Sequence, residues 1–380
     1  CIISFLWRFI FISIKKMKEK ILFIAQEGLN KGGVQTVIMN ITKELSSKYQ
    51  FDIILFTNES RYYDEIFKSL GGRIFRISFF NSRNIYVKRL EKFLRKTIGY
   101  FLIKKIILRN GPYKAIHCHN SIESSTALSA AKSCGISKRI NQIHVVFDDS
   151  NSCFFSRMHH EYLKEKMSRL ATSSIGCSDL ACKSFFKDNY QVILNPFDDK
   201  LYIPSDEYTL FKNPIIIQVG NFSNLKNQLF SIKVFNELLK LYPDAHFNIV
   251  GHDDGGYMEK MYSLIEKYGI RRNITFFPAD ANIPKIMDSS SYLLMPSQTE
   301  SFGIVLVEAQ AMGLKCIASD KIPQESNAGG CIYKSIEDNP LEWAEIIIND
   351  FKKSKGAHRK YDMSSFTSMN IASQIEKLYE

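Results

Sequence analysis

Two glutamates eight positions apart are the residues best placed to do chemistry. Glu300 and Glu308 lie in the run PSQTESFGIVLVEA, residues 296–309. A buried strand ahead of this run would deliver Glu300 to the carboxyl edge of a parallel sheet, and Gly303 would let the backbone turn into a helix. Free N–H groups at the start of a helix suit a diphosphate, because they are unpaired donors at the positive end of the dipole. Glu308, further along the helix, can accept hydrogen bonds from ribose hydroxyls. The run therefore predicts a nucleotide site.

Either glutamate alone has a simpler interpretation. Glu300 would be a charge near a helix N-terminus, and Glu308 would be a solvated residue on the helix surface. The order of the motif favours the functional interpretation, because a strand, Pro-Ser, a glutamate, Phe-Gly and a second glutamate follow one another.

The elements that must position these residues alternate between short apolar runs and helical patterns. In the first part of the chain we expect strands at 21–25, 51–57, 73–77, 115–118, 139–146, 174–176 and 191–194, with helices at 34–45, 62–70, 85–108 and 124–133. In the second part we expect strands at 215–219, 246–250, 274–277, 292–295 and 316–318, with helices at 228–241, 257–268, 283–287, 304–312 and 372–379. This alternation is typical of doubly wound α/β domains with parallel sheets.

The length of 380 residues predicts two domains. We take the polar, proline-containing stretch 198–213 as the linker between them. The expected parts are an N-terminal Rossmann-like domain at 17–200, a C-terminal Rossmann-like domain at 201–362, and a C-terminal helix at 363–380 that packs back towards the N-terminal domain. Residues 1–16 are expected to be an upstream extension, because the chain begins with Cys1 and Met17 immediately precedes the first expected strand.

The net charge of +11 is unevenly distributed. Residues 1–200 hold 32 Lys/Arg against 17 Asp/Glu, and residues 201–380 hold 18 against 22. Segment 85–109 combines an apolar stripe with eight basic residues and the single acidic residue Glu91, and we expect a basic amphipathic helix broken near Gly99. It predicts a peripheral contact with an anionic membrane. An ordinary solvated basic face is the simpler interpretation.

Other classes of protein fit the sequence less well. The eight cysteines are scattered, which is typical of a reduced, cytoplasmic protein. A nicotinamide-dependent oxidoreductase needs a GxGxxG turn after its first strand, and Gly32-Gly33 lacks that spacing. A nucleic-acid-binding protein needs exposed aromatic residues among the basic ones, whereas Phe93 and Phe101 fall on the apolar stripe. We expect no nucleic-acid partner, and no metal because no Asp-x-Asp pair is present.

With the E-x7-E spacing of Glu300 and Glu308, the chain from about residue 21 to its C-terminus resembles the retaining GT-B glycosyltransferases of family 4, in particular those of bacterial exopolysaccharide and capsule synthesis. The resemblance implies two facing Rossmann-like domains with a cleft between them. It implies a nucleoside diphosphate sugar as co-substrate, with no cofactor, held by the C-terminal half. Glu300 would approach the donor sugar and Glu308 would hold the ribose. The acceptor, a saccharide or a lipid-linked saccharide, would bind the N-terminal half.

The same resemblance assigns the other site residues. Lys226 matches the lysine that neutralises the donor phosphates, whereas Asn221 stands where the family has an arginine, so one bidentate phosphate donor is lost. The expected catalytic residues are Glu300, Lys226 and His119. The expected donor-binding residues are Gly220, Asn221, Lys226, Gly251, Pro296, Ser297, Glu300, Phe302, Gly303, Ile304 and Glu308.

The N-terminal half and the connecting segment give weaker signals. A glycine pair that follows the first strand would allow close approach of a phosphate or acceptor. Two histidines each end an expected strand, although such a histidine is often structural. An Asn and an Asp match the family's interdomain Asn-Gly-x-Asp segment, with Pro196 in place of its Gly. The expected acceptor or cleft residues are Gly32, Gly33, His119, His144, Asn195 and Asp198.

These observations predict a cytoplasmic, retaining, metal-independent glycosyltransferase that works at the inner face of the cell membrane in exopolysaccharide or capsule synthesis. A sugar-nucleotide epimerase or a phosphorylase on the same architecture is the nearest enzymatic alternative. A non-catalytic nucleic-acid-binding protein is the alternative from another class.

Overall fold

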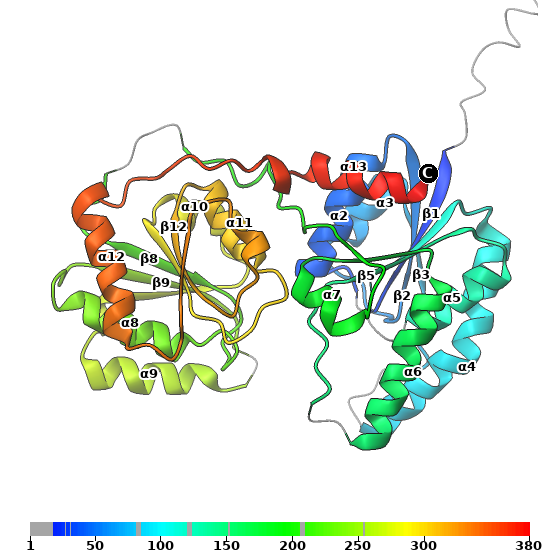
Figure 1. The fold of residues 1–380 in the computed structure, drawn as a ribbon, viewed down its shortest axis with the longest axis horizontal. Coiled ribbons are helices and arrows are strands. Elements are labelled where there is room, and N and C mark those ends of the chain that lie inside the picture. Colours follow the sequence, from blue (N-terminus) through cyan, green and yellow to red (C-terminus); the bar gives the residue numbers. More distant parts are fainter. Residues whose placement is uncertain are drawn as a thin grey trace, which may run out of the picture. The chain divides into compact units, whose positions relative to one another are not determined.

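The chain forms two compact units, each built on its own parallel sheet (Figure 1). The computed structural model describes residues 18–26, 28–30, 32–80, 85–119, 124–150, 153–205, 210–253 and 255–380. The expected extension 1–16 lies outside them. The N-terminal unit comprises the described residues up to Gln142 together with Asp149–Ile175 and Ile375–Glu380, and the C-terminal unit comprises Ile143–Asp148 and Gly176–Gln374. The predicted α/β class with two doubly wound domains is confirmed.

The first sheet has seven strands in the order β3-β2-β1-β4-β5-β6-β7. Its strands are β1 (Glu19–Ala25), β2 (Tyr49–Leu55), β3 (Arg73–Arg76), β4 (Ala115–Cys118), β5 (Lys138–Ile143), β6 (Ser173–Gly176) and β7 (Gln191–Val192). The helices between them are α2 (Gly33–Leu45), α3 (Asp64–Ser69), α4 (Ile85–Asn110), α5 (Ser124–Ser133), α6 (Phe154–Leu170) and α7 (Asp179–Phe185).

The second sheet has six strands in the order β10-β9-β8-β11-β12-β13. Its strands are β8 (Ile215–Val219), β9 (His246–Gly251), β10 (Ile274–Pro278), β11 (Tyr292–Met295), β12 (Lys315–Ser319) and β13 (Cys331–Lys334). Its α-helices are α8 (Gln228–Leu239), α9 (Tyr257–Tyr268), α10 (Ile283–Asp288), α11 (Ile304–Ala311) and α12 (Pro340–Ser354), and α13 (Ser368–Tyr379) ends the chain.

Both sheets contain a topological switch point. In the first sheet the chain runs outward from β1 to β3 and then returns to the other side of β1 as β4. In the second it runs from β8 to β10 and returns beside β8 as β11, pairing Ile216 with Tyr292. The loops after the two central strands diverge at such a point and leave a crevice at the carboxyl edge. Each sheet therefore offers one natural place for a ligand.

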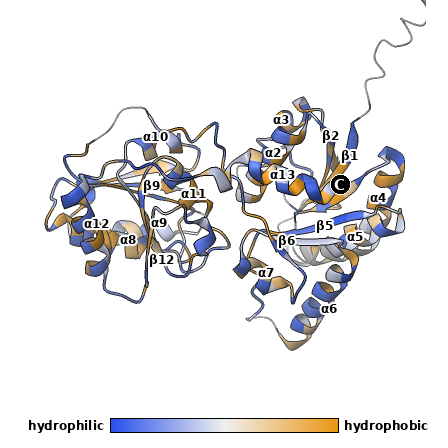
Figure 2. Ribbon diagram, turned by 45° about the horizontal axis from the view of Figure 1, so that its top comes forward, coloured by the Kyte–Doolittle hydropathy of each residue, from blue (hydrophilic) through white to orange (hydrophobic). Residues whose placement is uncertain are grey.

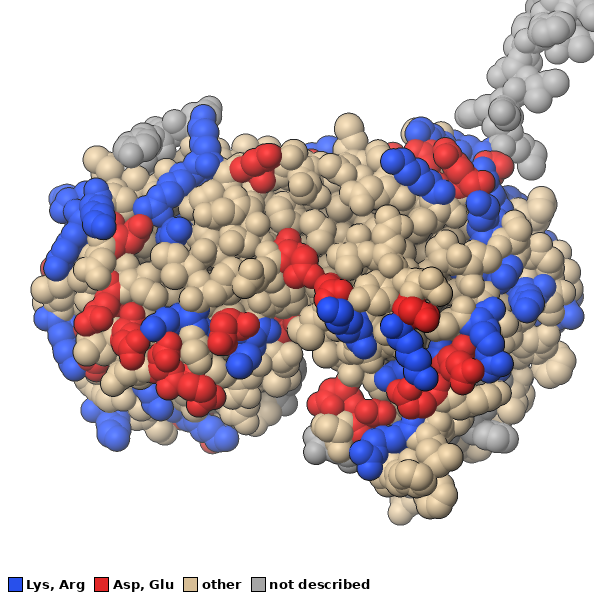
Figure 3. All heavy atoms as spheres, in the orientation of Figure 1, with Lys and Arg blue, Asp and Glu red and all other residues tan. Residues whose placement is uncertain are grey.

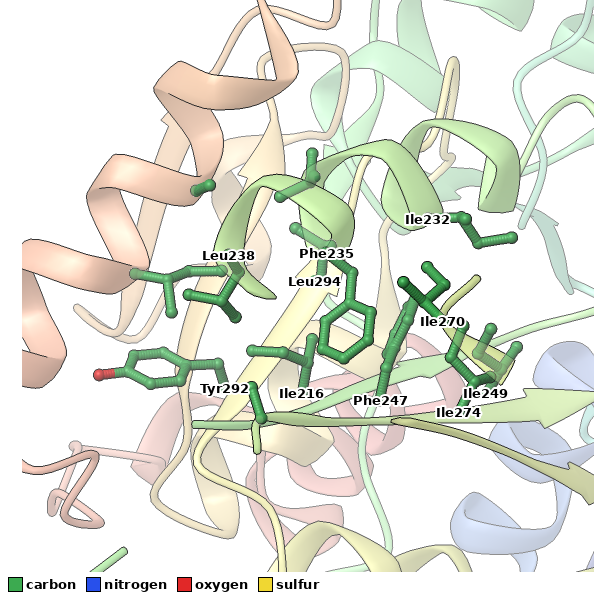
Figure 4. Close-up of a cluster of buried hydrophobic side chains, with 14 of the residues drawn as sticks. Ile216, Ile232, Phe235, Leu238, Phe247, Ile249, Ile270, Ile274, Tyr292 and Leu294 are labelled. Carbon is green, nitrogen blue, oxygen red and sulfur yellow. The ribbon is translucent and has the colours of Figure 1, made fainter. Parts of the chain in front are cut away.

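Successive residues of the central strands pack on opposite faces of the second sheet, as the alternation of a strand requires. Ile216 of β8 lies in a cluster with Phe235 of α8 and Trp343 of α12, part of which Figure 4 shows. The next residue, Ile217, lies in a second cluster with Leu306 of α11. Helices thus cover both faces, and the helices themselves carry both hydrophobic and hydrophilic residues (Figure 2).

Helix α4 runs unbroken through Gly99, which corrects the expected break. A glycine within a helix costs about 1 kcal/mol relative to alanine. Gly99 is buried and α4 packs along α5, so tertiary contacts offset that cost. Among the described residues, no helix combines the length and apolar character needed to cross a membrane.

The last turn of α13 belongs to the N-terminal unit by its contacts. Tyr379 is fully buried, and its hydroxyl oxygen lies 2.8 Å from Nδ1 of His117 on β4. Its ring meets that of Tyr49 edge-on, with centroids 5.8 Å apart, and Lys48 pairs with Glu376 at 2.7 Å. These contacts fix the end of the chain on the first sheet.

Candidate active site

A lysine and a glutamate meet at the switch point of the second sheet. Lys226 lies in the loop after β8 and Glu300 in the loop after β11, and Lys226 Nζ lies 2.5 Å from Glu300 Oε1. Their side chains are 28% and 13% exposed, so the pair is partly shielded but still reachable by a ligand. A cation and a carboxylate are thus brought together from positions 74 residues apart, as the sequence predicts for one site.

The loop after β8 is shaped by a close approach of two glycines. A Cβ on Gly251, at the end of β9, would lie 2.2 Å from the carbonyl oxygen of Gly220, so only glycine fits there. A Cβ on Gly220 would lie 3.3 Å from Cδ of Lys226. The Gln218 amide donates to the Lys226 carbonyl at 2.8 Å, and the Gln228 amide donates to that of Asn221 at 3.1 Å. These contacts hold Lys226 in place.

The two loops are tied together beside this pair. The Asn227 side-chain amide donates to the Pro296 carbonyl at 3.2 Å, and the backbone N–H of Gln298 donates to the Leu225 carbonyl at 2.8 Å. Ser297 is fully buried, and its hydroxyl has no hydrogen-bond partner among the described residues. A buried hydroxyl without a partner is costly, so it marks a place where a ligand atom can supply the missing bond.

Helix α11 begins at the same edge. Its N-cap is Gly303, which has φ +84° and no side chain, so no side-chain cap occupies the first N–H groups from Ile304 onward. These groups lack intrahelical acceptors and lie at the positive end of the helix dipole. Phe302 is 3% exposed and packs in the core. Its ring therefore anchors the turn that leads into the helix.

Glu308 lies on α11 with a half-buried side chain. Removal from water raises the pKa of its carboxyl to about 8. A hydrogen bond from Tyr202 acts in the opposite direction, and the charge of Asp198 adds to the rise. Asp198, which we expected among the acceptor or cleft residues, is therefore close enough to act on Glu308, the residue expected to bind the ribose of the donor.

Ser301, next to Glu300, is held by residues from two other segments of the C-terminal unit. Its hydroxyl accepts the backbone N–H of Val146 at 2.8 Å, and its carbonyl accepts the hydroxyl of Ser178 at 2.5 Å. Here the serine hydroxyl is used to fix the loop that carries Glu300.

Two further expected residues, His144 and Asn195, contact each other within the C-terminal unit. Both are 8% exposed. Burial lowers the pKa of His144 to about 4, and a hydrogen bond with Asn195 counteracts this in part. The imidazole is therefore neutral at neutral pH.

The N-terminal candidates gather at the switch point of the first sheet. His119 follows β4, and its backbone N–H donates to Ile24 of β1 at 2.9 Å. Its ring stacks on His117, with centroids 4.1 Å apart, and meets Phe23 edge-on at 5.0 Å. His119 is 3% exposed.

The glycine pair lies after the neighbouring strand β1. Gly32 caps α2 without a side-chain hydrogen bond, and a Cβ on it would lie 2.5 Å from Oε1 of Gln35. A Cβ on Gly33 would meet nothing within 4 Å. The end of the flexible Gln35 side chain could move away from a Cβ on Gly32, and no described residue fills the space beside Gly33.

Asn221 is exposed and puts no charge beside Lys226.

Two residues near the candidate sites escaped the sequence analysis, one in each unit. Tyr202 lies in the stretch expected to be a linker, where its pattern carries no signal. His117 lies on β4 two residues before His119, which follows the strand, so the period of two could have indicated it.

Residues 206–327 match the family model of the glycosyl transferases group 1. EpsF of Bacillus subtilis (strain 168), which is named as a glycosyltransferase, is 27% identical over 338 residues, covering 84% of this chain and 85% of EpsF. CapH of Staphylococcus aureus, named as a capsular polysaccharide biosynthesis glycosyltransferase, is 22% identical over 362 residues, covering 92% of this chain and 96% of CapH.

Among solved structures, Anabaena HepE in complex with UDP is similar with a TM-score of 0.74 at 17% identity, over 94% of this chain and 98% of that chain. This similarity extends over both sheets. The matched family domain covers the loops that carry Lys226 and Glu300. The chain therefore carries a glycosyl transferases group 1 domain in its C-terminal half, and its fold is the GT-B architecture of glycosyltransferases.

Proposed function

We propose that this protein transfers a sugar, with retention, from a nucleoside diphosphate sugar to a saccharide or lipid-linked acceptor during exopolysaccharide or capsule synthesis. The observation that carries the proposal is the contact of Lys226 with Glu300 at the open start of α11. One group suits an anionic diphosphate and the other suits the sugar attached to it. The name of CapH supports the polysaccharide product.

In the proposed reaction the bond between the anomeric carbon and the diphosphate oxygen breaks, and the electron pair leaves with the diphosphate. Lys226 and the first N–H groups of α11 stabilise the negative charge that develops there. The acceptor hydroxyl forms the new bond on the same face, and its proton passes to the departing phosphate. Glu300 orients the sugar, and Glu308 accepts hydrogen bonds from the ribose. No step in this scheme needs a metal or a cofactor.

The acceptor is assigned to the N-terminal unit, where the glycine pair and His119 lie at the switch point of the first sheet. An ion pair also lies at this edge, since Arg61 pairs with Glu59 after β2 and packs beside Gly28 in the loop after β1. The diphosphate is assigned to the second sheet, because Lys226 and Glu300 lie there beside the start of α11.

A thermal-shift screen with UDP, GDP and ADP tests the donor site first, because a ligand that binds only the folded state raises Tm. We expect UDP to give the largest shift, since HepE is described in complex with UDP. The same screen is repeated with a Lys226→Met variant. If no diphosphate raises Tm, the assignment of the site is overturned.

Product analysis with a labelled UDP-sugar then separates the reaction classes. Transfer places the label on a saccharide acceptor, and NMR of the new linkage reads its anomeric configuration. An epimerase returns the label in a different sugar nucleotide, and a phosphorylase releases a sugar phosphate only when phosphate is present. Activity that excess chelator abolishes and Mg²⁺ restores would refute metal independence.

The membrane contact is also a proposal, and it concerns the basic side chains of α4. Arg95 pairs with Glu91 and donates to the carbonyl of Phe56, so it belongs to the fold. Phe101, expected on a buried stripe, is 69% exposed, close to exposed Lys105 and Arg109. On the face shown in Figure 3, basic side chains lie among acidic ones. The side chains of Lys88, Arg89, Lys92 and Lys96 lie outside the described ones, so among those described the exposed end of α4 is the best candidate for anionic headgroups.

Co-sedimentation with vesicles of anionic or neutral lipid tests this surface at low and high salt. We expect wild type to bind anionic vesicles at low salt and a Lys105/Arg109→Glu variant to bind them much less. A Lys352/Lys353→Glu variant changes two exposed lysines of α12 as a matched control. Equal loss in both variants would show a general effect of charge and would remove the assignment to α4.

A further inference from the structure

Helix α13 bonds to a histidine that lies against the candidate acceptor residue. Tyr379 of α13 is fully buried, and its hydroxyl oxygen lies 2.8 Å from Nδ1 of His117 on β4. On the other side of the imidazole, Nε2 of His117 lies 2.9 Å from Oε1 of Gln142 on β5. His117 is itself fully buried, so the fold supplies partners for both of its ring nitrogens.

These two contacts favour one tautomer of His117. The side-chain oxygen of Gln142 can only accept, so Nε2 of His117 carries the proton and Nδ1 accepts one from Tyr379. Burial raises the pKa of Tyr379 well above its usual value, so its hydroxyl keeps the proton that it donates. Any other tautomer, or a flipped ring, would leave a buried polar atom unpaired, which is costly.

The position of Gln142 follows from the register of the first sheet. His117 of β4 pairs with Ile140 of β5, and Gln142 lies two residues further along β5. Residues two apart on a strand lie on the same face, so Gln142 shares a face with His117. The acceptor for Nε2 therefore comes from the sheet, whereas the donor to Nδ1 comes from α13.

His119 lies against the ring that is fixed in this way. The rings of His117 and His119 stack with their centroids 4.1 Å apart and their planes at 25°. Phe23 of β1 meets both rings edge-on, with centroid distances of 5.6 Å to His117 and 5.0 Å to His119. A change in the tilt of His117 would therefore change the surface on which His119 packs.

The last turn of α13 is held on the first sheet by further contacts. Lys48, just before β2, pairs with Glu376 of α13 at 2.7 Å. The Tyr379 ring meets those of Tyr49 and His117 edge-on, with centroid distances of 5.8 and 5.9 Å. The Tyr379 hydroxyl is thus presented to His117 from a fixed direction.

We propose that Tyr379 is a positioning residue of the acceptor site, which fixes the ring of His117 and, through it, the orientation in which His119 receives the acceptor hydroxyl. The proposal rests on the proposed function, because that function assigns the acceptor to His119. It gives a part in the reaction to a helix that carries none of the predicted site residues.

The first experiment needs no ligand. Nitrogen-15 NMR of the full chain, labelled at histidine, reports which ring nitrogen carries a proton, and His117→Gln and His119→Asn identify the two sets of signals by their loss. We expect wild-type His117 to be protonated at Nε2 alone. Tyr379→Phe keeps the buried ring and removes only the hydroxyl, so it should shift the signals of both histidines. A proton on Nδ1 in wild type, or unmoved His119 signals in the variant, would overturn the proposal.

Two matched controls remove other tyrosine hydroxyls of the same unit. Tyr49→Phe alters the ring beside Tyr379, and Tyr113→Phe removes a buried hydroxyl that donates to Asp52 at 2.6 Å. Both should leave the His119 signals in place, even if Tyr113→Phe lowers Tm. Equal shifts in a control and in Tyr379→Phe would show that His119 responds to packing rather than to the bond with His117, and the proposal would fail.

The second experiment is a double-mutant cycle on activity, with labelled UDP-glucose as donor and the saccharide that takes up the label as acceptor. We expect Tyr379→Phe to lower kcat/KM for the acceptor by roughly three- to tenfold, the size of effect that one buried hydrogen bond has. The dissociation constant of UDP should not change. In the His119→Asn background, Tyr379→Phe should have no further effect, because it acts through His119. Effects that multiply in the double variant would contradict the proposal.

The outcomes separate this proposal from the proposed function. If the NMR signals move as expected but His119→Asn transfers sugar as wild type does, Tyr379 positions His119 and the assignment of the acceptor fails. If His119→Asn loses transfer while Tyr379→Phe keeps wild-type kinetics, the acceptor assignment stands and the role of Tyr379 is refuted.

Discussion

The two switch points of this protein have the same topology but hold different chemistry. At the second sheet, Lys226 and Glu300 form an ion pair beside an uncapped helix start. At the first sheet, the corresponding loops carry a glycine pair and His119, whose ring stacks on His117. Both places arise because parallel strands end at one edge where the chain reverses its direction across the sheet.

The difference indicates a division of labour within one architecture. The charged side chains at the second sheet suit a nucleoside diphosphate sugar, whose bond between sugar and diphosphate breaks in the proposed reaction. At the first sheet the described residues bring together buried histidine rings and the Arg61–Glu59 pair beside Gly28, which can hydrogen-bond the hydroxyls of an acceptor. The fold explains where a ligand binds, and the side chains at each edge explain which ligand it is.

The largest effect expected from this comparison is that of Glu300→Gln. Removing the charge next to the reacting sugar should lower turnover by roughly 10³-fold, equivalent to about 4 kcal/mol of transition-state stabilisation. The dissociation constant of UDP should change by less than tenfold, because the amide keeps the shape of the side chain. Turnover is measured with a labelled donor and binding by calorimetry.

Glu325→Gln is the matched control for that variant, since Glu325 is a glutamate of the same unit whose carboxylate bonds to backbone. Its turnover should stay within a few-fold of wild type. Wild-type turnover in Glu300→Gln would end the assignment of the second sheet as the place of reaction.

The next effect separates phosphate from ribose within the second sheet. Lys226→Met keeps the length of the side chain but removes its charge, so it should weaken UDP binding by roughly 10²-fold and leave uridine binding nearly unchanged. Glu308→Ala should weaken both ligands, since both contain the ribose. If Lys226→Met weakens uridine as strongly as UDP, the lysine holds the loop rather than the phosphates.

A smaller effect is expected at the first sheet. His119→Asn should lower kcat/KM for the acceptor by roughly tenfold to 10²-fold, the usual range for a positioned polar group. The dissociation constant of UDP should not change, because His119 belongs to the other switch point. Weaker UDP binding in this variant would contradict the division between the two sheets.

The positions of the loops at the two switch points could largely be predicted from the sequence. Buried parallel strands are continuous apolar runs, and the ends of these runs mark where the loops begin. The strand that delivers Glu300 and the loop that carries Lys226 follow from that pattern. The contact between them follows from the strand order, which brings β8 and β11 together.

Helices α6, α7 and α12 and strand β13 are absent from the predicted elements, and α6 and α12 were missed for different reasons. Helix α6 buries Leu163 and Met167 and leaves Phe154 and Phe155 exposed, so it has no clear apolar stripe. Helix α12 does carry a signal, since Asn339 caps it and proline follows at its start. Tyr202 could not be predicted, because the segment before it is held by hydrogen bonds of Phe197 with Phe366 and Ser368, far along the chain.

The smallest expected effects concern stability, and they compare two titratable groups of the C-terminal unit, Glu308 and His144. The pKa of Glu308 is raised to about 8, so between its unfolded value of about 4.5 and pH 8 the unfolded chain releases a proton that the folded chain keeps. Stability is therefore lost as pH rises through that window. Glu308→Gln should raise Tm at pH 8.5 and have little effect at pH 5, in differential scanning fluorimetry without nucleotide.

His144 should show the reverse dependence, because burial lowers its pKa from 6.5 to about 4. Below pH 6.5 the unfolded chain takes up a proton that the folded chain refuses, so stability is lost as pH falls towards 4. His144→Gln should remove that loss, and its Tm relative to wild type should rise by a few degrees from pH 8 to pH 4.5, since 1 kcal/mol moves Tm by roughly 2–4 °C in a domain of this size. Each variant serves as the control for the other. Parallel Tm changes across the whole pH range would mean that packing, rather than proton binding, governs both positions.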